Sequence, residues 1–218
     1  MDLDVLYLDN HLLVVRKPIG MLVQGNHTGD DNLLDLGKAF LKVKFNKPGN
    51  VFLGLVHRLD RPVSGVVVFA RTSTAARRLS EQFRKRTVEK RYWALVQGKI
   101  SENGRLVNYL ARRQTKSRVV EDENRGQRAE LSFERLAYKD GVSWVEVDLA
   151  TGRHHQIRVQ FAHFGHPLLG DYKYGSRKPF PNRSVALHAR SLSVVHPTKK
   201  EQMTFEAEPE AFWPKQFT

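Results

Sequence analysis

The chain has 218 residues, 40% hydrophobic and 27% charged, so it can build a core and is neither a disordered nor a fibrous sequence. Lys and Arg number 36 against 23 Asp and Glu, and this formal net charge of +13 predicts a polyanionic partner, either nucleic acid or an anionic membrane. The absence of cysteine excludes disulfide scaffolds, thiolate metal sites and cysteine nucleophiles.

The sequence gives no sign of a targeting or membrane segment. It begins with acidic residues rather than a basic region followed by an apolar one, so we expect no signal peptide. No stretch approaches the roughly 20 apolar residues that a spanning helix needs. Together with the missing cysteines, these features predict a soluble, cytoplasmic protein.

The basic excess is concentrated in two segments. Residues 71–91 carry eight basic side chains against two acidic ones, and residues 153–200 carry nine against Asp171 alone. The first 70 residues are nearly balanced, with eight basic and seven acidic side chains. A basic surface kept for solubility is the alternative, but the one-sided sign favours a surface that follows phosphates.

The first half of the chain predicts alternating strands and helices. Apolar runs predict a hairpin over residues 5–15, a helix over 33–43 capped by Asp31, and a buried strand over 66–70. A helix that begins at Thr72 or Ser73 and a strand over 92–96 follow. Residues 105–128 are polar and basic, and we expect a surface excursion there.

The second half predicts antiparallel strands and one helix. Residues 129–134 and 144–149 alternate in polarity, as half-buried strands do, and residues 192–205 predict a last hairpin. Residues 154–164 fit a helix followed by Gly165. Since no linker or repeat divides the chain, the prediction is a single α+β domain over residues 1–218, with a central, largely antiparallel or mixed sheet flanked by helices and loops.

The first candidate site is the loop before the buried strand. Its carboxylate, Asp60, lies between Arg58 and Arg61, whose positive charges favour the ionised form. Such a carboxylate can be a nucleophile, a base or an ion-pair partner. On spacing alone, a structural aspartate held in a turn by arginines is the stronger alternative.

The second candidate site spans residues 151–160. Gly152 permits a tight turn, after which His154, Ile157 and Arg158 are expected on one face of the helix. A helix N-terminus with Arg153 beside it suits a phosphate group, and a capped surface helix is the alternative.

Metal and nucleotide-cofactor motifs are not found in the sequence. The histidine-dense stretch 154–166 lacks a known ligand spacing, and the glycine-rich phosphate loops of nucleotide enzymes are missing. We therefore expect neither a metal nor a cofactor.

Five sequence blocks, in order along the chain, resemble those of the RluA-type pseudouridine synthases. The blocks, each followed by the family pattern that it resembles, are His57–Gly65 (H-R-L-D-x-x-T-S-G), Lys90–Val96 (K-x-Y-x-A-x-V), Thr151–Val159 (T-G-R-x-H-Q-I-R-V), Gly165–Asp171 (G-H-P-I-x-G-D) and Leu187–Ala189 (L-H-A). Val63 replaces the usual threonine, so any role of that hydroxyl is absent. We expect a compact member without the S4-like RNA-binding module of many relatives.

The resemblance implies an isomerase that converts uridine to pseudouridine in structured ribosomal or transfer RNA, without cofactor or metal. It implies that Asp60 is the catalytic carboxylate, which attacks C1′ of the ribose or removes its 2′ proton. Tyr92 would stack on the target base and help remove the C5 proton. Arg158 would pair with Asp60 and hold it ionised.

The resemblance also implies a set of RNA-binding residues. Arg58 would enter the RNA stack in place of the flipped base, Leu187 would pack in the base pocket, and Arg61, Arg153 and His154 would contact the RNA. We expect a monomer without an obligate protein partner. The alternatives are a catalytically silent RNA-binding or RNA-folding protein on the same scaffold and, ranked last, a peripheral membrane protein.

Overall fold

The computed structural model describes residues 3–26 and 29–214, and the chain divides into two compact units. Unit 1 comprises residues 1–89 and 189–209, and unit 2 comprises residues 90–188 and 210–218. Both units combine helices with largely antiparallel strands, which confirms the α+β class. The single domain over residues 1–218 stays a prediction.

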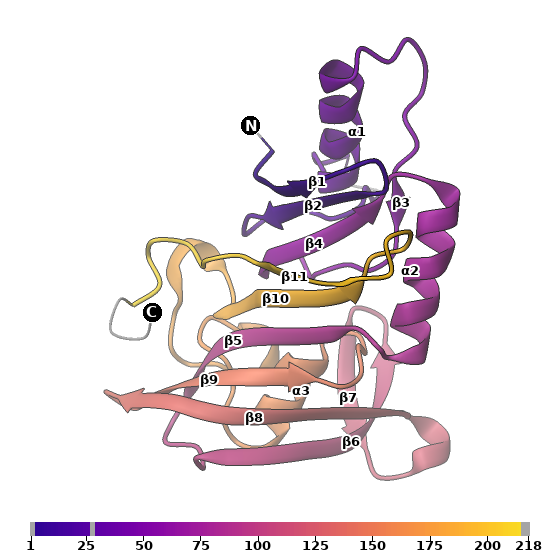
Figure 1. Cartoon of the computed structure of the whole chain (residues 1–218). Coiled ribbons are helices and arrows are strands. Elements are labelled where there is room, and N and C mark those ends of the chain that lie inside the picture. Colours follow the sequence, from indigo (N-terminus) through magenta and orange to yellow (C-terminus); the bar gives the residue numbers. More distant parts are fainter. Residues whose placement is uncertain (1–2, 27–28, 215–218) are drawn as a thin grey trace. The chain divides into compact units, whose positions relative to one another are not determined.

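Unit 1 is built on a sheet with the strand order β1-β2-β4-β10, in which β3 pairs with β4 and β11 with β10 (Figure 1). Its elements are β1 (Val5–Leu8), β2 (Leu12–Lys17), α1 (Leu33–Lys44), β3 (Gly54–Leu55), β4 (Ser64–Ala70), α2 (Ser73–Lys85), β10 (Leu187–Val195) and β11 (Gln202–Glu206). The first two residues of β10 fall in unit 2. Both predicted hairpins are confirmed, and β4 is buried along its whole length, as predicted.

The N-cap of helix α1 lies one residue later in the chain than predicted. Asn32 rather than Asp31 is the N-cap: its backbone is extended, and its side chain accepts a hydrogen bond from the Asp35 N–H at 3.1 Å. The Asp31 prediction is therefore wrong. Asn and Asp are equally good N-caps, so two adjacent candidates cannot be ranked from the sequence.

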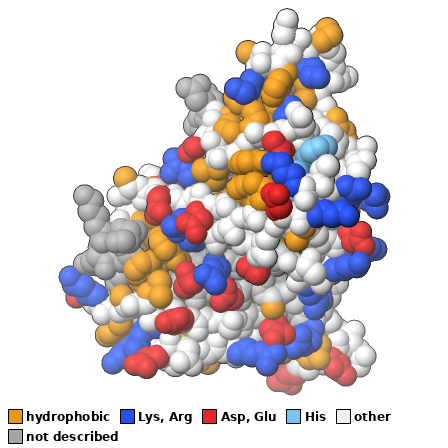
Figure 2. All heavy atoms as spheres, viewed as in Figure 1, with side chains coloured by type: hydrophobic (Ala, Val, Ile, Leu, Met, Phe, Trp, Pro, Cys, Tyr) orange, Lys and Arg blue, Asp and Glu red, His pale blue; other side chains and the backbone are white. Residues whose placement is uncertain are grey.

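Helix α2 packs on β3 and β4 (Figure 1) and carries four basic residues, Arg77, Arg78, Arg84 and Lys85. Thr72 caps it, as one of the two predicted starts, by accepting a hydrogen bond from the Ala75 N–H at 3.1 Å. Ala75 and Leu79 are buried in the core, whereas Lys and Arg side chains gather along the outer side of the helix (Figure 2).

Unit 2 is built on an antiparallel sheet with the order β5-β9-β8-β6-β7 (Figure 1). Its strands are β5 (Glu89–Gln97), β6 (Asn103–Arg113), β7 (Lys116–Val120), β8 (Gln127–Lys139) and β9 (Val142–Leu149). Helix α3 (Gln156–His163) packs against β6 and β7, and three short 3₁₀ helices complete the unit: η1 (Glu123–Arg125), η2 (Tyr172–Tyr174) and η3 (Pro181–Arg183). The strands predicted over 92–96, 129–134 and 144–149 are confirmed as parts of longer strands.

Two predictions for unit 2 need correction. The polar segment 105–128 is not only a surface excursion, because most of it forms the β6–β7 hairpin, whose side chains are mostly exposed or half-buried. Helix α3 begins at Gln156, after His155 in a left-handed conformation (φ 56°). His154 therefore precedes the helix and does not share its face, whereas Gly165 follows the helix end with φ 90°, as predicted.

Within residues 3–26 and 29–214, no helix is long and apolar enough to cross a membrane.

Candidate active site

Asp60 lies in unit 1, in the irregular segment between β3 and β4. Its neighbours Leu59 and Val63 are 8% and 2% exposed, so the loop is anchored in the core on both sides of the half-buried Asp60. The Asp60 carbonyl accepts a hydrogen bond from the Val63 N–H at 3.1 Å. The side chain at position 63 is buried, so replacing a threonine by valine there leaves no hydroxyl to satisfy.

A fully buried lysine braces the turn that follows Asp60. Lys17 ends β2, and its Nζ donates to three backbone carbonyls at 2.8–3.2 Å, including that of Arg61. The Gly20 N–H donates to the same Arg61 carbonyl at 2.9 Å. A buried charge is tolerated when its hydrogen bonds are made. Lys17 is not among the predicted site residues, and its signal in the sequence is a lysine that closes an apolar strand.

Two further residues of the 57–65 block, His57 and Gly65, make close contacts with the backbone of unit 1. His57 Nε2 accepts from the Val68 N–H at 3.0 Å, and its ring stacks on Phe83 with centroids 4.8 Å apart. Gly65 has φ 120°, and a Cβ on it would lie 2.3 Å from the Ala189 carbonyl oxygen. Only glycine therefore allows β4 to pass Ala189 this closely.

The two arginines beside Asp60 are placed differently. Arg61 is bonded within unit 1, since its Nε donates to the Gly20 carbonyl at 2.9 Å and its Nη1 contacts Asp30 at 2.8 Å. Arg58 is exposed. Arg61 is exposed as well, so both arginines reach the surface and Arg61 is also bonded to Gly20 and Asp30 of its own unit.

In unit 2, Arg158 and Asp171 form a buried, bidentate ion pair. The distances are 2.7 Å from Nε to Oδ2 and 2.8 Å from Nη2 to Oδ1, and the side chains are 6% and 1% exposed. This fork fixes the plane of the guanidinium. The sequence analysis missed the role of Asp171, although a lone carboxylate among the nine basic residues of 153–200 is a signal for it.

The ion pair continues into a polar network that connects α3, η2 and β7. The Arg158 guanidinium carbon lies 5.4 Å from the centre of the Tyr174 ring. The Tyr174 hydroxyl accepts from the Ser117 N–H at 2.9 Å and bonds His155 Nδ1 at 2.8 Å. Ser117 Oγ donates to the His154 carbonyl at 2.8 Å and lies 2.9 Å from its Nδ1. The network therefore fixes the orientation of the His154 ring.

Gln156 organises the start of the 151–159 block. Its Oε1 accepts from the Thr151 hydroxyl at 2.7 Å and from the Arg153 N–H at 3.0 Å, while its Nε2 donates to the Glu130 carbonyl at 3.1 Å. The Arg153 side chain donates from Nε to the Arg128 carbonyl at 3.1 Å. Buried Gln156 thus fixes the backbone position from which the Arg153 side chain extends.

The remaining predicted residues of unit 2 lie on strands. Tyr92 is half-buried on β5 opposite Val147 of β9, and Leu187 begins β10 with 5% of its surface exposed. The 165–171 loop is fixed beside β5, where the Leu169 N–H donates to the Leu95 carbonyl at 2.9 Å.

The predicted site residues are thus divided by unit. Asp60, Arg58 and Arg61 share one loop of unit 1, and unit 2 holds Tyr92, Arg153, His154, Arg158 and Leu187. The pairing of Arg158 with Asp60 stays a prediction. Among the described residues, no group of three or more His, Cys, Asp or Glu side chains is suited to a metal ion.

The comparisons with known proteins decide the family. A family model described as RNA pseudouridylate synthase matches residues 11–163. The chain belongs to this family. Its members are isomerases that act on RNA, and the resemblance to the RluA-type synthases is confirmed by the relatives.

Similarity to these relatives extends over nearly the whole chain. Ribosomal large subunit pseudouridine synthase D of Zymomonas mobilis is 36% identical over 94% of this chain and 69% of its own length. The dual-specificity RNA pseudouridine synthase RluA of Haemophilus influenzae is 38% identical over 94% of this chain and 92% of its own. Among solved structures, human RNA pseudouridylate synthase domain containing 4 matches with a TM-score of 0.81 and 25% identity, over 96% of this chain and 90% of that one.

Proposed function

We propose that this protein isomerises uridine to pseudouridine in structured ribosomal or transfer RNA, with Asp60 as the catalytic carboxylate. The observation that carries the proposal is the braced turn at Asp60 in a chain of the RNA pseudouridylate synthase family. A rigid loop beside a buried strand is a common setting for a reacting side chain. The related synthases that are named for ribosomal RNA and for dual specificity support the choice of substrate class.

The reaction breaks the N1–C1′ bond of uridine, turns the uracil and forms a C5–C1′ bond, after which the C5 proton leaves. In this proposal Asp60 either attacks C1′ or removes the 2′ proton. Tyr92 stacks on the base, an interaction worth about 1–3 kcal/mol per base. Arg158 supports the carboxylate, and its bidentate bond to Asp171 supports this role because a held guanidinium is already oriented.

The target nucleotide must leave its stack before its glycosidic bond can react, at a cost of a few kcal/mol. Exposed Arg58 suits the place that the base vacates, because a planar guanidinium stacks well. Arg153 and His154 contact the RNA, and Leu187 packs in the base pocket. Because Arg61 is already bonded to Gly20 and Asp30, we assign it to holding the loop.

The proposal has consequences for the protein as a whole. Because Asp60 lies in unit 1 and Tyr92 and Arg158 lie in unit 2, we propose that both units work as a single catalytic domain. We also propose a cytoplasmic monomer that needs no protein partner.

Tritium release from RNA that contains 5-tritiated uridine tests the proposal. We expect release by the wild-type protein and none by Asp60→Asn, which preserves side-chain shape but removes the charge. Asp35→Asn, at an exposed position of α1, is the control and should keep full activity. Activity of Asp60→Asn equal to wild type would refute the catalytic assignment. RNA binding without isomerisation of any cellular RNA would support the silent RNA-binding alternative.

A further inference from the structure

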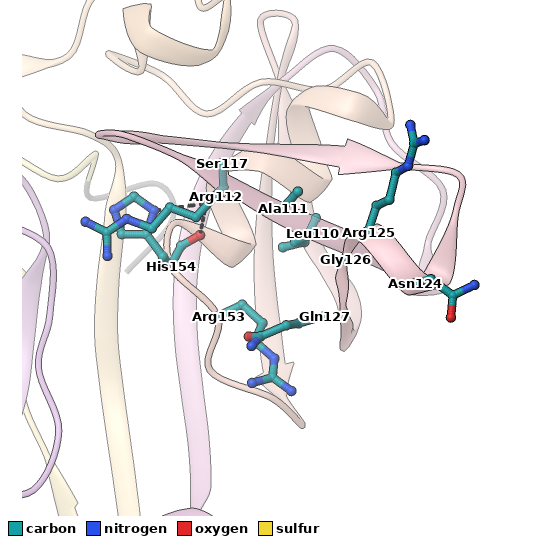
Figure 3. Close-up of a pocket in the computed structure, with 10 residues that line it drawn as sticks. All are labelled: Leu110, Ala111, Arg112, Ser117, Asn124, Arg125, Gly126, Gln127, Arg153 and His154. Carbon is teal, nitrogen blue, oxygen red and sulfur yellow. Dashed lines mark hydrogen bonds between the residues drawn. The ribbon is translucent and has the colours of Figure 1, made fainter.

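Unit 2 contains a cavity of about 510 Å³ beside the β6–β7 hairpin, and its lining includes Arg153 and His154, which the proposed function assigns to RNA contact (Figure 3). Its walls come from the ends of β6 and β8, from β7, from η1 and from residues 153–154. The polar side chains of its lining are Arg112, Ser117, Asn124, Arg125, Gln127, Arg153 and His154. The lining contains no carboxylate, so the cavity favours an anion.

The strand register places Arg112 on the cavity side of the hairpin. Arg112 of β6 is directly opposite Ser117 of β7, and side chains of directly opposite residues share a face of the sheet. Ser117 in turn bonds His154. The next residue, Arg113, points to the opposite face because side chains alternate along a strand, and it does not line the cavity.

The lining arginines differ in whether they already pair with a carboxylate. Figure 3 shows Arg112, Arg153 and His154 among the lining residues, whereas the Arg125 side chain points away from them. Arg125 is bonded to Asp122 at 3.2 Å. Among the described residues, Arg112 has no carboxylate partner and uses its Nε to bond the Gln114 carbonyl at 3.0 Å. Arg112 can therefore bind an anion without first breaking an ion pair.

We propose that this cavity binds a phosphodiester group of the substrate RNA, with Arg112 and Arg153 as the charged donors and the fixed His154 ring between β7 and α3 as a further contact. A guanidinium binds phosphate oxygens with two parallel hydrogen bonds, and an exposed arginine loses little hydration on doing so. The volume lies within the 300–1,000 Å³ that is typical of ligand sites. This inference rests on the proposed function, because it takes RNA as the ligand.

The first test measures binding of a fluorescein-labelled decauridylate to the full-length protein by anisotropy at several salt concentrations. We expect Arg112→Gln to raise Kd about five- to tenfold and to reduce the slope of log K against log[salt] by about 0.7, as for one lost phosphate contact. Arg113→Gln removes the same charge from the other face and should change Kd less than about twofold. Arg112→Lys keeps the charge and should recover part of the affinity. Equal effects of Arg112→Gln and Arg113→Gln would overturn the proposal.

A second probe separates a phosphate contact from a base contact. A decauridylate with uncharged methylphosphonate linkages should bind the wild-type protein and Arg112→Gln with equal affinity. A difference between them that persists on this probe would overturn the assignment to phosphate. Thermal unfolding of each variant checks that its fold is intact.

Tritium release tests the proposed function independently of this inference. An inactive wild-type protein in which Arg112→Gln still weakens decauridylate binding would refute the isomerase and support the cavity. An active protein whose Kd for decauridylate does not respond to Arg112→Gln would support the isomerase and refute the cavity.

Discussion

Arg158 is positioned by a carboxylate of its own unit, and both partners are almost fully buried. Taking two charges out of water is unfavourable, and the pair is stable only while each charge compensates the other. Removing one partner therefore leaves a charge in a medium that solvates it poorly.

Asp171→Asn keeps the shape of the side chain and removes its charge. We expect it to lower the free energy of unfolding by about 3–5 kcal/mol, the range for breaking a buried ion pair. Urea denaturation measures this change. Glu81→Gln is the control, because its pair with Lys85 on α2 is exposed and should matter little. A loss for Asp171→Asn no larger than that of the control would contradict the prediction.

Asp9 is the centre of a second polar cluster, at the turn between β1 and β2, and its side chain is half-buried. Burial raises the pKa of Asp9, but hydrogen bonds from the His11 and Leu12 N–H groups and from the Tyr7 and His196 side chains outweigh it and lower the pKa to about 2. The folded state thus prefers the ionised carboxylate.

Asp9 makes the stability of the protein depend on pH. Since its pKa in the folded state is below the ordinary 3.8, the stabilisation is complete above about pH 4 and is lost as the pH falls towards 2. Asp9→Asn should therefore lower the free energy of unfolding by about 1–2 kcal/mol at pH 7, and the difference should shrink towards zero near pH 2. Unfolding curves of both proteins across this pH range measure it. A difference that does not vary with pH would exclude this origin.

The sequence identified the residues of the candidate site but not their supports. Asp60, Tyr92 and Arg158 lie in sequence blocks that resemble those of a known family, so the resemblance to that family points to them. Lys17 contacts Arg61, 44 residues away, and Asp171 contacts Arg158, 13 residues away. Such contacts follow from the folded structure rather than from local pattern.

At the scale of elements, the approach of β4 to β10 depends on Gly65. A side chain there would meet the Ala189 backbone and would also need a left-handed φ of 120°. Both demands act against any residue other than glycine.

Gly65→Ala should therefore lower the free energy of unfolding by about 3 kcal/mol or more, because strain and overlap add. Gly20→Ala is the matched control in the same unit. Its φ is 82°, but nothing lies within 4 Å of the added Cβ, so only the backbone strain of about 1 kcal/mol remains. Chemical denaturation of both variants tests the difference. Equal losses would show that the close approach to Ala189 is unimportant.

The elements with a clear apolar period were predictable, and the others were not. The buried strand β4 and the outer hairpins carry continuous or alternating apolar residues. Only Leu110 and Ser117 are buried in strands β6 and β7, and the other side chains are exposed or half-buried. Their polar sequence therefore gives little sign of the hairpin that backbone pairing forms. The start of α3 was missed because His155 adopts a left-handed conformation, which is uncommon for residues other than glycine.

At the scale of the whole molecule, the charge is uneven along the sequence. The near-neutral first 70 residues contain Asp60 and Arg58. The basic segment 71–91 ends beside Tyr92, and the basic segment 153–200 contains Arg153, His154, Arg158 and Leu187. In unit 1 the basic side chains of α2 contribute to this excess.

Reversal of charge on α2 tests whether this excess binds RNA. Arg77→Glu with Arg84→Glu should weaken binding of a labelled RNA hairpin and flatten its salt dependence, because phosphate contacts are lost, with less effect on turnover at saturating RNA. Arg78 is left intact because it bonds the Pro197 carbonyl at 2.6 Å. Reversal of Lys42 and Lys44 on α1, in the near-neutral segment, is the control. A salt response that neither pair of substitutions alters would refute a role for α2 in RNA binding.

The division into units has a consequence for how the protein is made. Strand β4 is wholly buried and is apolar from Val66 to Ala70, yet its neighbour β10 belongs to a segment synthesised more than a hundred residues later. While the ribosome builds unit 2, the incomplete first unit presents an open, hydrophobic strand edge, the kind of surface on which nascent chains aggregate. The late return of the chain makes the interval between β4 and β10 the period when a chaperone would protect it most.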